Sequence, residues 1–538
     1  MTRSFNLADL FEVVADAVPD KLALVAGEVR LTYRELDERA NRIAHHLAEA
    51  GVRGGDHVSI LSYNRAEWLE TQIAAWKIRA VPVNVNYRYT ADELAYVIAD
   101  SSSVALVGER SLIARLGDAR EKLADLRHTV VIEDGSDEDV PGAVSYEDAV
   151  AKVSGERDFA DRSSDDLYLL YTGGTTGMPK GVMWRCEDIF ISAMGGGNLL
   201  GDPVQTPEEL GEKAMAGGLA MLICAPLMHG AGMWVAWSGL TSGSTVVLWT
   251  ERRFSADKVL EVAAAEKAQV LLLVGDAMAR PIADLLAASP GTYDLSSVLV
   301  IATGGSVTSG DVKARLHEAI PSMLTILDAF GGSETGAFSQ AIEPGDDGAP
   351  RFMPRGDDVA VLDAALRVIE KGSDEIGVVA RKGRIPLGYW NDEAKTAKTF
   401  VTGDDGTRWA LQGDMARMDA DGAIVLLGRG SLVINTGGEK VFVEEVEATL
   451  KSHPAIYDAL VVGVSDQRLG SRVAAVVSLA EDASEDAAAG EGLVDELVAH
   501  CRTTLAGYKV PRDIRVVDEV KRSPAGKADY RWAKSVWA

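Results

Sequence analysis

Apolar residues recur along this chain at two spacings, one typical of helices and the other of buried strands. From Leu36 to Leu47 they repeat at helical spacing, so that one face of a helix is apolar. Just before this stretch, Thr32 and Glu35 form the capping-box pattern that begins many helices, and Thr90 with Glu93 repeats it. The sequence therefore predicts helices that begin after Thr32 and after Thr90.

Short runs of apolar and β-branched residues lie between the expected helices and predict strands. These runs cover residues 57–62, 81–85, 104–108, 167–170, 245–249, 269–275 and 297–305. Strands that alternate with helices are typical of parallel sheets covered by helices. We therefore expect an α/β fold whose large N-terminal domain is built on parallel-rich sheets.

The pattern changes near Gly428, where a glycine-punctuated segment begins. Beyond it the sequence predicts two helices and two strands, over residues 443–451, 459–464, 473–479 and 493–505. This size and pattern are typical of a small α+β domain. We expect an N-terminal domain of residues 1–428, a hinge, and a mobile C-terminal domain of residues 429–538.

The composition restricts the partners and the location of the protein. The formal net charge of −27 comes from 54 Lys and Arg against 81 Asp and Glu in 538 residues. Such a surface repels nucleic acid, so we expect no nucleic-acid partner. The three cysteines show no disulfide or metal spacing, and the N-terminus lacks the apolar core of a signal peptide. Both features favour a reducing, cytoplasmic location.

The longest stretch without Lys, Arg, Asp or Glu covers residues 214–250, which by length alone could cross a membrane. Pro226, His229 and repeated glycines divide it into short pieces, so a buried pocket wall is the favoured interpretation. We expect no transmembrane span, and the sequence leaves open a peripheral contact with a membrane and a homodimer. Residues 201–218, which overlap the start of this stretch, are typical of a helical insertion or a lid.

The segment from Tyr171 to Gly181 reads YTGGTTGMPKG and follows an expected strand. Glycines let successive backbone N–H groups turn toward one point, while threonine hydroxyls add donors and Lys180 adds charge. Open α/β sheets bind ligands at such a strand end. The segment therefore predicts a phosphate-binding loop, although it does not fit the Walker pattern. A flexible surface linker is the alternative, which the strand, the threonine cluster and the single lysine disfavour.

Seven further segments follow this loop. In chain order, the set is YTGGTTGMPKG (171–181), PLMHGAG (226–232), TGGSV (303–307), AFGGSETG (329–336), GYWNDEAKTAKTF (388–400), QGD (412–414), GRGSLVINTGGEKV (428–441) and SPAGK (523–527). Together they resemble the acyl-adenylate-forming superfamily, which includes acyl-CoA synthetases, luciferases and peptide-synthetase adenylation domains. The segment MPKGVMWR (178–185) is most similar to the corresponding segment of actinobacterial acyl-CoA ligases that act on fatty acids or sterol side chains.

This resemblance implies a reaction in two halves, with ATP, Mg²⁺ and CoA as the required small molecules. A carboxylate and ATP first give acyl-AMP and pyrophosphate, and the CoA thiol then displaces AMP. Because a carboxylate is already ionised at neutral pH, the site must supply positive charge and positioning rather than a general base.

The resemblance also implies roles for individual residues. Lys527 carries the first half-reaction by reaching the α-phosphate, and Glu334 with Thr176 holds Mg²⁺. Phe330 stacks on adenine, Asp414 binds the ribose hydroxyls, and Arg429 lies nearby. The remaining ATP and AMP ligands are Thr172, Gly173, Gly174, Thr175, Lys180, Gly304, Gly305, Ser306, Asp328, Ala329, Gly331 and Ser333.

The C-terminal domain is expected to swing between the two half-reactions about Ser431, where family members usually carry Asp or Lys. The swing brings a glycine-rich segment to the pantetheine tunnel of CoA. By resemblance that segment contains Gly437, Gly438, Glu439 and Lys440.

For the acyl pocket, the resemblance implies a wall of His229, Met233, Trp234 and Trp237. Methionine and tryptophan suit an apolar tail, although some of these side chains could simply fill the core. Amino-acid-activating relatives usually hold the substrate amine with an Asp, and this region of the chain has none. The nearby Asp276 is a possible exception. The pattern disfavours an amino-acid substrate. Cys186, where relatives often have histidine, is expected to be a packing residue.

Two other functions remain open from the sequence. One is an acyl-AMP ligase that loads a carrier protein instead of CoA. The other is a non-catalytic nucleotide-binding or acyl-binding homologue, which the presence of both Lys527 and Glu334 disfavours.

Overall fold

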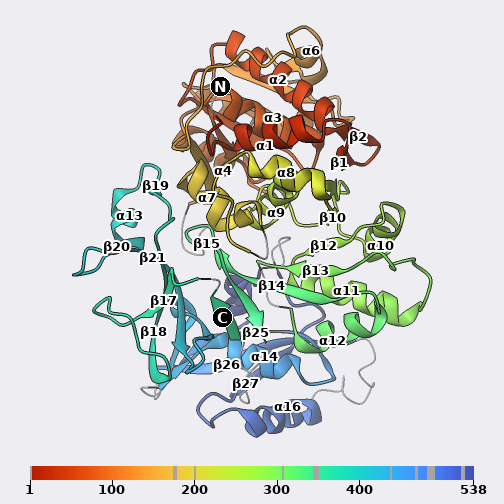
Figure 1. Ribbon diagram of the computed structural model, residues 1–538. Helices are drawn as coiled ribbons and strands as arrows, with labels where there is room; N and C mark the ends of the chain where they lie inside the picture. The colour runs from red at the N-terminus through yellow and green to blue at the C-terminus, as the bar shows by residue number, and fades with distance from the viewer. Residues whose placement is uncertain are drawn as a thin grey trace.

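The computed structural model describes residues 3–173, 178–198, 201–305, 308–342, 351–354, 356–436, 439–466, 470–480, 491–522 and 527–537. These residues form a large mixed sheet, a second sheet and a small C-terminal sheet, with helices packed around them (Figure 1). The N-terminal helices, in red, lie at the top of Figure 1, and the blue C-terminal segments lie at the bottom.

The large sheet joins a parallel half to an antiparallel half through β14 (Thr325–Gly332). This strand runs parallel to β13 over residues 325–328 and antiparallel to β15 over residues 329–332. In order across the sheet, the strands are β17 (Val359–Leu362), β18 (Ser373–Lys382), β21 (Arg408–Met418), β22 (Ile424–Arg429), β16 (Arg351–Pro354), β15 (Gly336–Ile342), β14, β13 (Val300–Thr303), β12 (Val270–Leu273), β10 (Ala220–Ile223), β11 (Thr245–Leu248), β1 (Leu22–Ala26) and β2 (Val29–Thr32), with β20 (Phe400–Thr402) paired to β21.

The second sheet carries the glycine-rich loop between two antiparallel strands, β8 and β9. In order, its strands are β19 (Gly388–Tyr389), β9 (Lys180–Arg185), β8 (Leu167–Thr172), β4 (Val81–Asn84), β3 (His57–Leu61), β5 (Ser103–Glu109), β6 (His128–Ile132) and β7 (Val144–Ser145). The strands from β8 to β7 are parallel to their neighbours.

The small sheet belongs to the C-terminal part of the chain. Its strands are β24 (Glu439–Val441), β23 (Ile434–Thr436), β26 (Gly470–Leu479) and β25 (Ile456–Asp466), with β27 (Asp513–Val516) paired to β26. It has its own apolar core, formed with α14 (Val443–Lys451) and α16 (Glu491–Thr504). This core and the alternation of strands and helices before it confirm the predicted α/β fold with a separate C-terminal domain.

The remaining helices cover the two larger sheets or connect strands. They are α1 (Leu7–Ala17), α2 (Tyr33–Glu49), α3 (Ala66–Lys77), α4 (Ala91–Asp100), α5 (Arg110–Ala114), α6 (Tyr146–Ala151), α7 (Cys186–Ala193), α8 (Glu209–Ala216), α9 (Gly230–Thr241), α10 (Ala256–Ala265), α11 (Gly275–Ala288), α12 (Gly310–Ala319), α13 (Glu393–Thr399) and α17 (Tyr530–Ser535), with short 3-10 helices η1 (Gly117–Lys122), η2 (Gly195–Gly197) and η3 (Gly430–Leu432).

Local sequence signals predicted several of these elements well. Both capping boxes are present, since Thr32 and Thr90 each exchange hydrogen bonds with the glutamate three residues later. Two predicted strands were too long: β12 ends at Leu273 because α11 begins at Gly275, and β13 covers only residues 300–303. The antiparallel strands between residues 325 and 429 were not predicted individually.

Residues 214–250 fold as β10, α9 and β11, and most of their side chains are buried. No described helix is both long enough and apolar enough to cross a membrane. Within the preceding insertion, α8 packs on α1, where Leu210 is buried. The three cysteines are free and buried, which confirms packing for Cys186.

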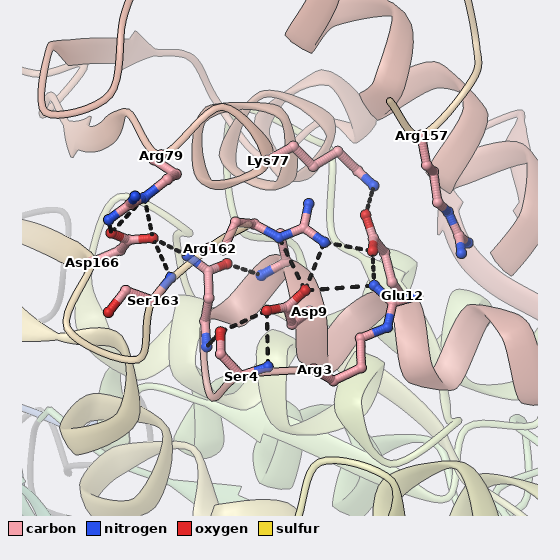
Figure 2. Close-up of polar contacts among 12 residues, drawn as sticks. Arg3, Ser4, Asp9, Glu12, Lys77, Arg79, Arg157, Arg162, Ser163 and Asp166 are labelled. Atoms are coloured by element: carbon pink, nitrogen blue, oxygen red, sulfur yellow. Dashed lines mark hydrogen bonds and ion pairs between the residues drawn. The ribbon is translucent and has the colours of Figure 1, made fainter. Parts of the chain in front are cut away.

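A buried network of ion pairs holds α1 against α3 and against the segment that leads into β8 (Figure 2). Lys77 is fully buried and pairs with Glu12 and, at 2.8 Å, with Asp37. Arg162 Nη2 lies 2.6 Å from carboxylate oxygens of both Asp9 and Glu12. Because this segment continues into β8, the network fixes the strand that carries the glycine-rich loop.

Burial raises the pKa of Glu12, but the attraction of Lys77, Arg162 and Arg3 outweighs it and lowers the value to about 2. A carboxyl group with a lowered pKa stabilises the fold above its unfolded-state pKa of about 4.3. That stabilisation is lost as the pH falls from there toward 2.

We expect Lys77→Met to lower the free energy of unfolding by about 3 kcal/mol, because it leaves two buried carboxylates short of a cation. The midpoint of urea unfolding, followed by tryptophan fluorescence, measures the loss. Lys152→Met is the matched control, since Lys152 pairs with Asp148 on the exposed surface and should change little. Equal midpoints for the two variants would show that the buried network does not stabilise the fold.

Candidate active site

The glycine-rich loop leaves and re-enters the second sheet at one point, because β8 and β9 stay paired up to Thr172 and Lys180. Lys180 Nζ lies 3.2 Å from the Asp392 carboxylate. Burial lowers the pKa of Lys180, but hydrogen bonds to Asp392 and Tyr96 outweigh it and raise the pKa overall. Gly173 is exposed at the start of the loop, and the predicted ligands Gly174, Thr175 and Thr176 lie outside the described residues.

Two buried asparagines bond the segment that follows β10, and one of them, Asn84, ties it to the glycine-rich loop. Asn84 accepts a hydrogen bond from Tyr171 N at 2.6 Å and donates to Tyr171 O at 2.9 Å and Met228 O at 2.7 Å. Asn64 bonds the main chain of residues 225–227, accepting at 2.8 Å and donating at 3.2 Å. Backbone groups buried between the sheets are thus satisfied by side chains. The loop and the expected acyl wall therefore have fixed relative positions.

Glu334 lies in the turn between β14 and β15. The Tyr389 hydroxyl donates to Glu334 Oε1 at 2.7 Å, and the Trp184 indole N–H donates to Ser333 O at 2.9 Å. Burial and the Glu334 charge raise the pKa of Tyr389 well above its usual range, so the tyrosine remains a donor. The turn needs glycine at Gly331, where a Cβ would lie 2.0 Å from a carbonyl oxygen of the facing strand. Two predicted motifs, at 329–336 and 388–400, therefore meet at this carboxylate.

The carboxylate of Glu334 is suited to bind a magnesium ion whose other ligands would be phosphate oxygens and water. Among the described residues, no group of three or more His, Cys, Asp or Glu could hold a metal ion alone. Mg²⁺ in nucleotide sites usually has one or two carboxylate ligands and completes its shell with phosphates and water. The second predicted ligand, Thr176, lies outside the described residues.

The segment from Gly304 to Ser309, which follows β13, carries three predicted ATP and AMP ligands, and we call it the adenine loop. Strand β13 runs beside β14. Asp328 is buried there, accepts a hydrogen bond from Thr303 Oγ1 at 2.7 Å and pairs with Lys313 Nζ at 2.8 Å. Asp276, at the start of α11, accepts a hydrogen bond from Ser309 N at 2.8 Å and so fixes the end of the loop after β13. Along this site Gly304 is buried, Gly305 and Ala329 are exposed, and Ser306 lies outside the described residues.

The predicted stacking residue and ribose ligand lie in the antiparallel half of the large sheet. Phe330 is half-buried, with its ring centroid 5.1 Å from that of Phe352. Asp414 is buried and stands opposite Arg429 in the β21–β22 register. Gln412 accepts a hydrogen bond from the Thr335 hydroxyl, which brings the QGD motif to the Glu334 turn.

The expected CoA segment continues into β24. Glu439 is exposed at the start of β24. Gly437 and Gly438 lie outside the described residues, as do the side chains of Arg429, Ser431 and Lys440.

The four residues expected in the acyl wall divide into two pairs. Met233 and Trp237 are fully buried against α3, where Gln72 donates to Met233 Sδ at 2.6 Å and accepts from Trp237 Nε1 at 3.0 Å. Trp234 lies against Gly230, whose added Cβ would meet the indole ring at 2.8 Å. His229 Nε2 is buried and has no hydrogen-bond partner among the described residues. The first pair thus packs the core, and His229 with Trp234 are better candidates for the wall.

The surroundings of His229 keep its imidazole without a proton. Burial, followed by the positive charges of Lys527 and Arg88, lowers the pKa of His229 to about 3. The imidazole is therefore neutral at physiological pH. Lys527, which is exposed in the C-terminal part of the chain, is thus one of two cations that disfavour a proton on His229.

Sequence reasoning did not identify some residues that support the site. Asn84 is the one polar residue of an otherwise apolar strand, and this contrast could have pointed to it. Tyr389 and Asp392 belong to a segment that was recognised as a motif without roles for its members.

The glycine-rich loop, the Glu334 turn and a separate C-terminal domain with its own core agree with the adenylate-forming enzymes that the sequence resembles. The chain matches the family model described as AMP-binding enzyme over residues 11–390 and that of the AMP-binding enzyme C-terminal domain over residues 445–527. The chain belongs to this family of AMP-binding enzymes.

Characterised relatives cover nearly the whole chain. It is 46% identical to a 3-oxocholest-4-en-26-oate–CoA ligase of Rhodococcus rhodochrous, over 99% of this chain and 96% of that protein. It is 45% identical, with the same coverage, to a medium/long-chain-fatty-acid–CoA/3-oxocholest-4-en-26-oate–CoA ligase of Mycolicibacterium smegmatis. Among solved structures, the anthranilate CoA ligase AuaEII in complex with anthranoyl-AMP matches with a TM-score of 0.85 and 25% identity, covering 100% of this chain and 98% of that one.

We expect Asn84→Leu and Asn64→Leu each to lower the free energy of unfolding by about 2 kcal/mol, because both leave buried backbone groups unpaired. Only Asn84 touches the glycine-rich loop, so only Asn84→Leu should raise the KM for ATP, by about tenfold. Urea unfolding and ATP saturation curves for the two variants provide the measurements. If both variants changed the KM equally, the proposed anchoring of the loop by Asn84 would be wrong.

Proposed function

We propose that this protein is an ATP-dependent acyl-CoA ligase for an apolar carboxylic acid, either a fatty acid or a sterol side-chain acid. The observation that carries the proposal is 46% identity over nearly the whole chain to a ligase named for a sterol side-chain acid. A second relative, from Mycobacterium avium, is 41% identical and is named a medium-chain acyl-CoA ligase. The neutral His229 and the adjacent Trp234 support an uncharged acyl group.

In the first half-reaction, a carboxylate oxygen forms a bond to the α-phosphorus of ATP while the bond to the pyrophosphate oxygen breaks. The glycine-rich loop, from Thr172 to Lys180, would hold the leaving pyrophosphate. Lys527 would stabilise the negative charge that builds at the α-phosphate and the carboxylate. Glu334 would hold Mg²⁺, which draws charge from the phosphate oxygens.

In the second half-reaction, the CoA sulfur forms a bond to the acyl carbon and AMP leaves with the former carboxylate oxygen. The thiol proton passes to solvent. The division into residues 1–428 and 429–538, with a hinge at Ser431, would let the C-terminal domain withdraw Lys527 before this step. Residues 437–440 would then line the path of the CoA arm.

The site assignments together account for ATP, Mg²⁺ and CoA as the small molecules required. ATP and CoA are cytoplasmic metabolites, and buried free cysteines suit a reducing compartment, so we propose a cytoplasmic location. A homodimer and a peripheral contact with a membrane remain predictions.

We expect the purified protein to release pyrophosphate and form thioesters with medium-chain and long-chain fatty acids or with 3-oxocholest-4-en-26-oate. The kcat/KM for the best of these acids should exceed that for acetate by about 100-fold, because burial of each further apolar group adds binding energy. Lys527→Ala should abolish acyl-AMP formation while largely sparing thioester formation from supplied acyl-AMP, whereas Lys534→Ala, an exposed lysine nearby, should do neither.

Other outcomes would lead to different functions. Acyl-AMP formation with transfer to a carrier protein, but not to CoA, would favour the acyl-AMP ligase. Failure of the wild type to release pyrophosphate with any apolar acid would favour a non-catalytic homologue. A preference for anthranilate or acetate would contradict the proposed substrate class.

A further inference from the structure

One ring contact joins the two parts of the chain. Tyr457, on β25 of the C-terminal domain, presents its ring to the guanidinium of Arg280 on α11, with 5.6 Å between the guanidinium carbon and the ring centroid. Tyr457 is 40% exposed, whereas the Arg280 side chain is only 9% exposed. A guanidinium over an aromatic face at this distance is attracted by the ring.

The same guanidinium also contacts the end of the predicted adenine loop. Arg280 lies 3.2 Å from Asp276, 3.3 Å from Asp311 and 3.1 Å from the Ser309 hydroxyl. Asp276 in turn accepts the hydrogen bond from Ser309 N. The loop end, the start of α12 and the C-terminal domain therefore share one cation. In Figure 1, α11 and α12 lie beside one another between the upper part of the molecule and the blue domain.

The pair is in contact in the same domain arrangement in which the charge of Lys527 helps to lower the pKa of His229. Arg280 is held by several neighbours of the N-terminal domain, whereas Tyr457 moves with the C-terminal domain. The swing of the C-terminal domain that the proposed function includes would therefore separate Tyr457 from Arg280.

We propose that Arg280 and Tyr457 are a positioning pair that holds the C-terminal domain in the arrangement for acyl-AMP formation and links that arrangement to the adenine loop. Neither residue touches the reacting atoms. The inference rests on the proposed two-step function, because the pair matters only if one half-reaction needs this arrangement and the other does not.

The test measures the two half-reactions separately in wild type, Tyr457→Leu and Tyr457→Phe. Leucine keeps apolar bulk but removes the aromatic face, and phenylalanine keeps the face. Tyr457→Leu should slow acyl-AMP formation, measured by pyrophosphate release without CoA, by about fivefold in kcat with little change in KM for ATP. Thioester formation from supplied acyl-AMP and CoA should be unchanged or faster. Tyr457→Phe should behave as wild type.

Two further variants distinguish loss of domain positioning from a general loss of stability in the C-terminal domain. Tyr508→Leu is the matched control, because Tyr508 is 42% exposed in the same domain and its ring faces Lys509 of that domain. It should leave both half-reactions unchanged. Arg280→Met should slow acyl-AMP formation and also raise the KM for ATP, since Arg280 contacts the adenine loop. Adding Tyr457→Leu to Arg280→Met should cause no further loss.

An unchanged rate of acyl-AMP formation in Tyr457→Leu would overturn the proposal, and so would equal slowing of both half-reactions. Equal slowing in Tyr457→Leu and Tyr457→Phe would also exclude a role of the ring face. If the wild type formed no acyl-AMP at all, the proposed function itself would fail, and the positioning pair with it.

Discussion

The site depends on two buried amide side chains that hold the two larger sheets together where the predicted ligands meet. Asn84, at the end of β4, and Asn64, in the bend after β3, hydrogen-bond the main chain that follows β10 in the large sheet. A buried carbonyl or N–H without a partner is costly, so this junction tolerates little displacement. Because Asn84 also bonds both backbone groups of Tyr171, the glycine-rich loop is fixed to the same junction.

Other parts of the site are held by hydrogen bonds of their own. Tyr389 and Trp184 hold the Glu334 turn, and Asp276 and Arg280 hold the end of the adenine loop. All four of these side chains belong to the N-terminal domain, so they would keep their positions in both half-reactions. Lys527 comes from a domain with its own core, so the proposed delivery and withdrawal of its charge would not require the binding site to unfold.

Much of the fold could be predicted from the sequence because its signals are local. Capping boxes place the starts of α2 and α4, and continuous apolar runs place β3, β4 and β5. The antiparallel half of the large sheet could not be predicted in this way. Its pairing joins residues far apart in the chain, such as β16 with β22, and short-range periodicity contains no information about such partners.

The motifs in the sequence pointed to candidate site residues but not to the contacts that these residues make. Motifs pointed to Lys180 and Glu334, yet their partners Asp392 and Tyr389 became evident only in the fold. The acyl wall shows a second limit. Helix α9 is buried on most of its surface, so its hydrophobic pattern could not separate Met233, which packs the core, from Trp234.

The central claim, that the carboxylate of an apolar acid is activated by bonding to the α-phosphate, can be tested by following oxygen atoms. A fatty acid labelled with oxygen-18 in its carboxylate would be converted with ATP and CoA, and the products examined by mass spectrometry. The proposed mechanism predicts that the released AMP carries one oxygen-18 atom from the acid and that the pyrophosphate carries none. Unlabelled AMP, or label in inorganic phosphate, would contradict an acyl-adenylate intermediate.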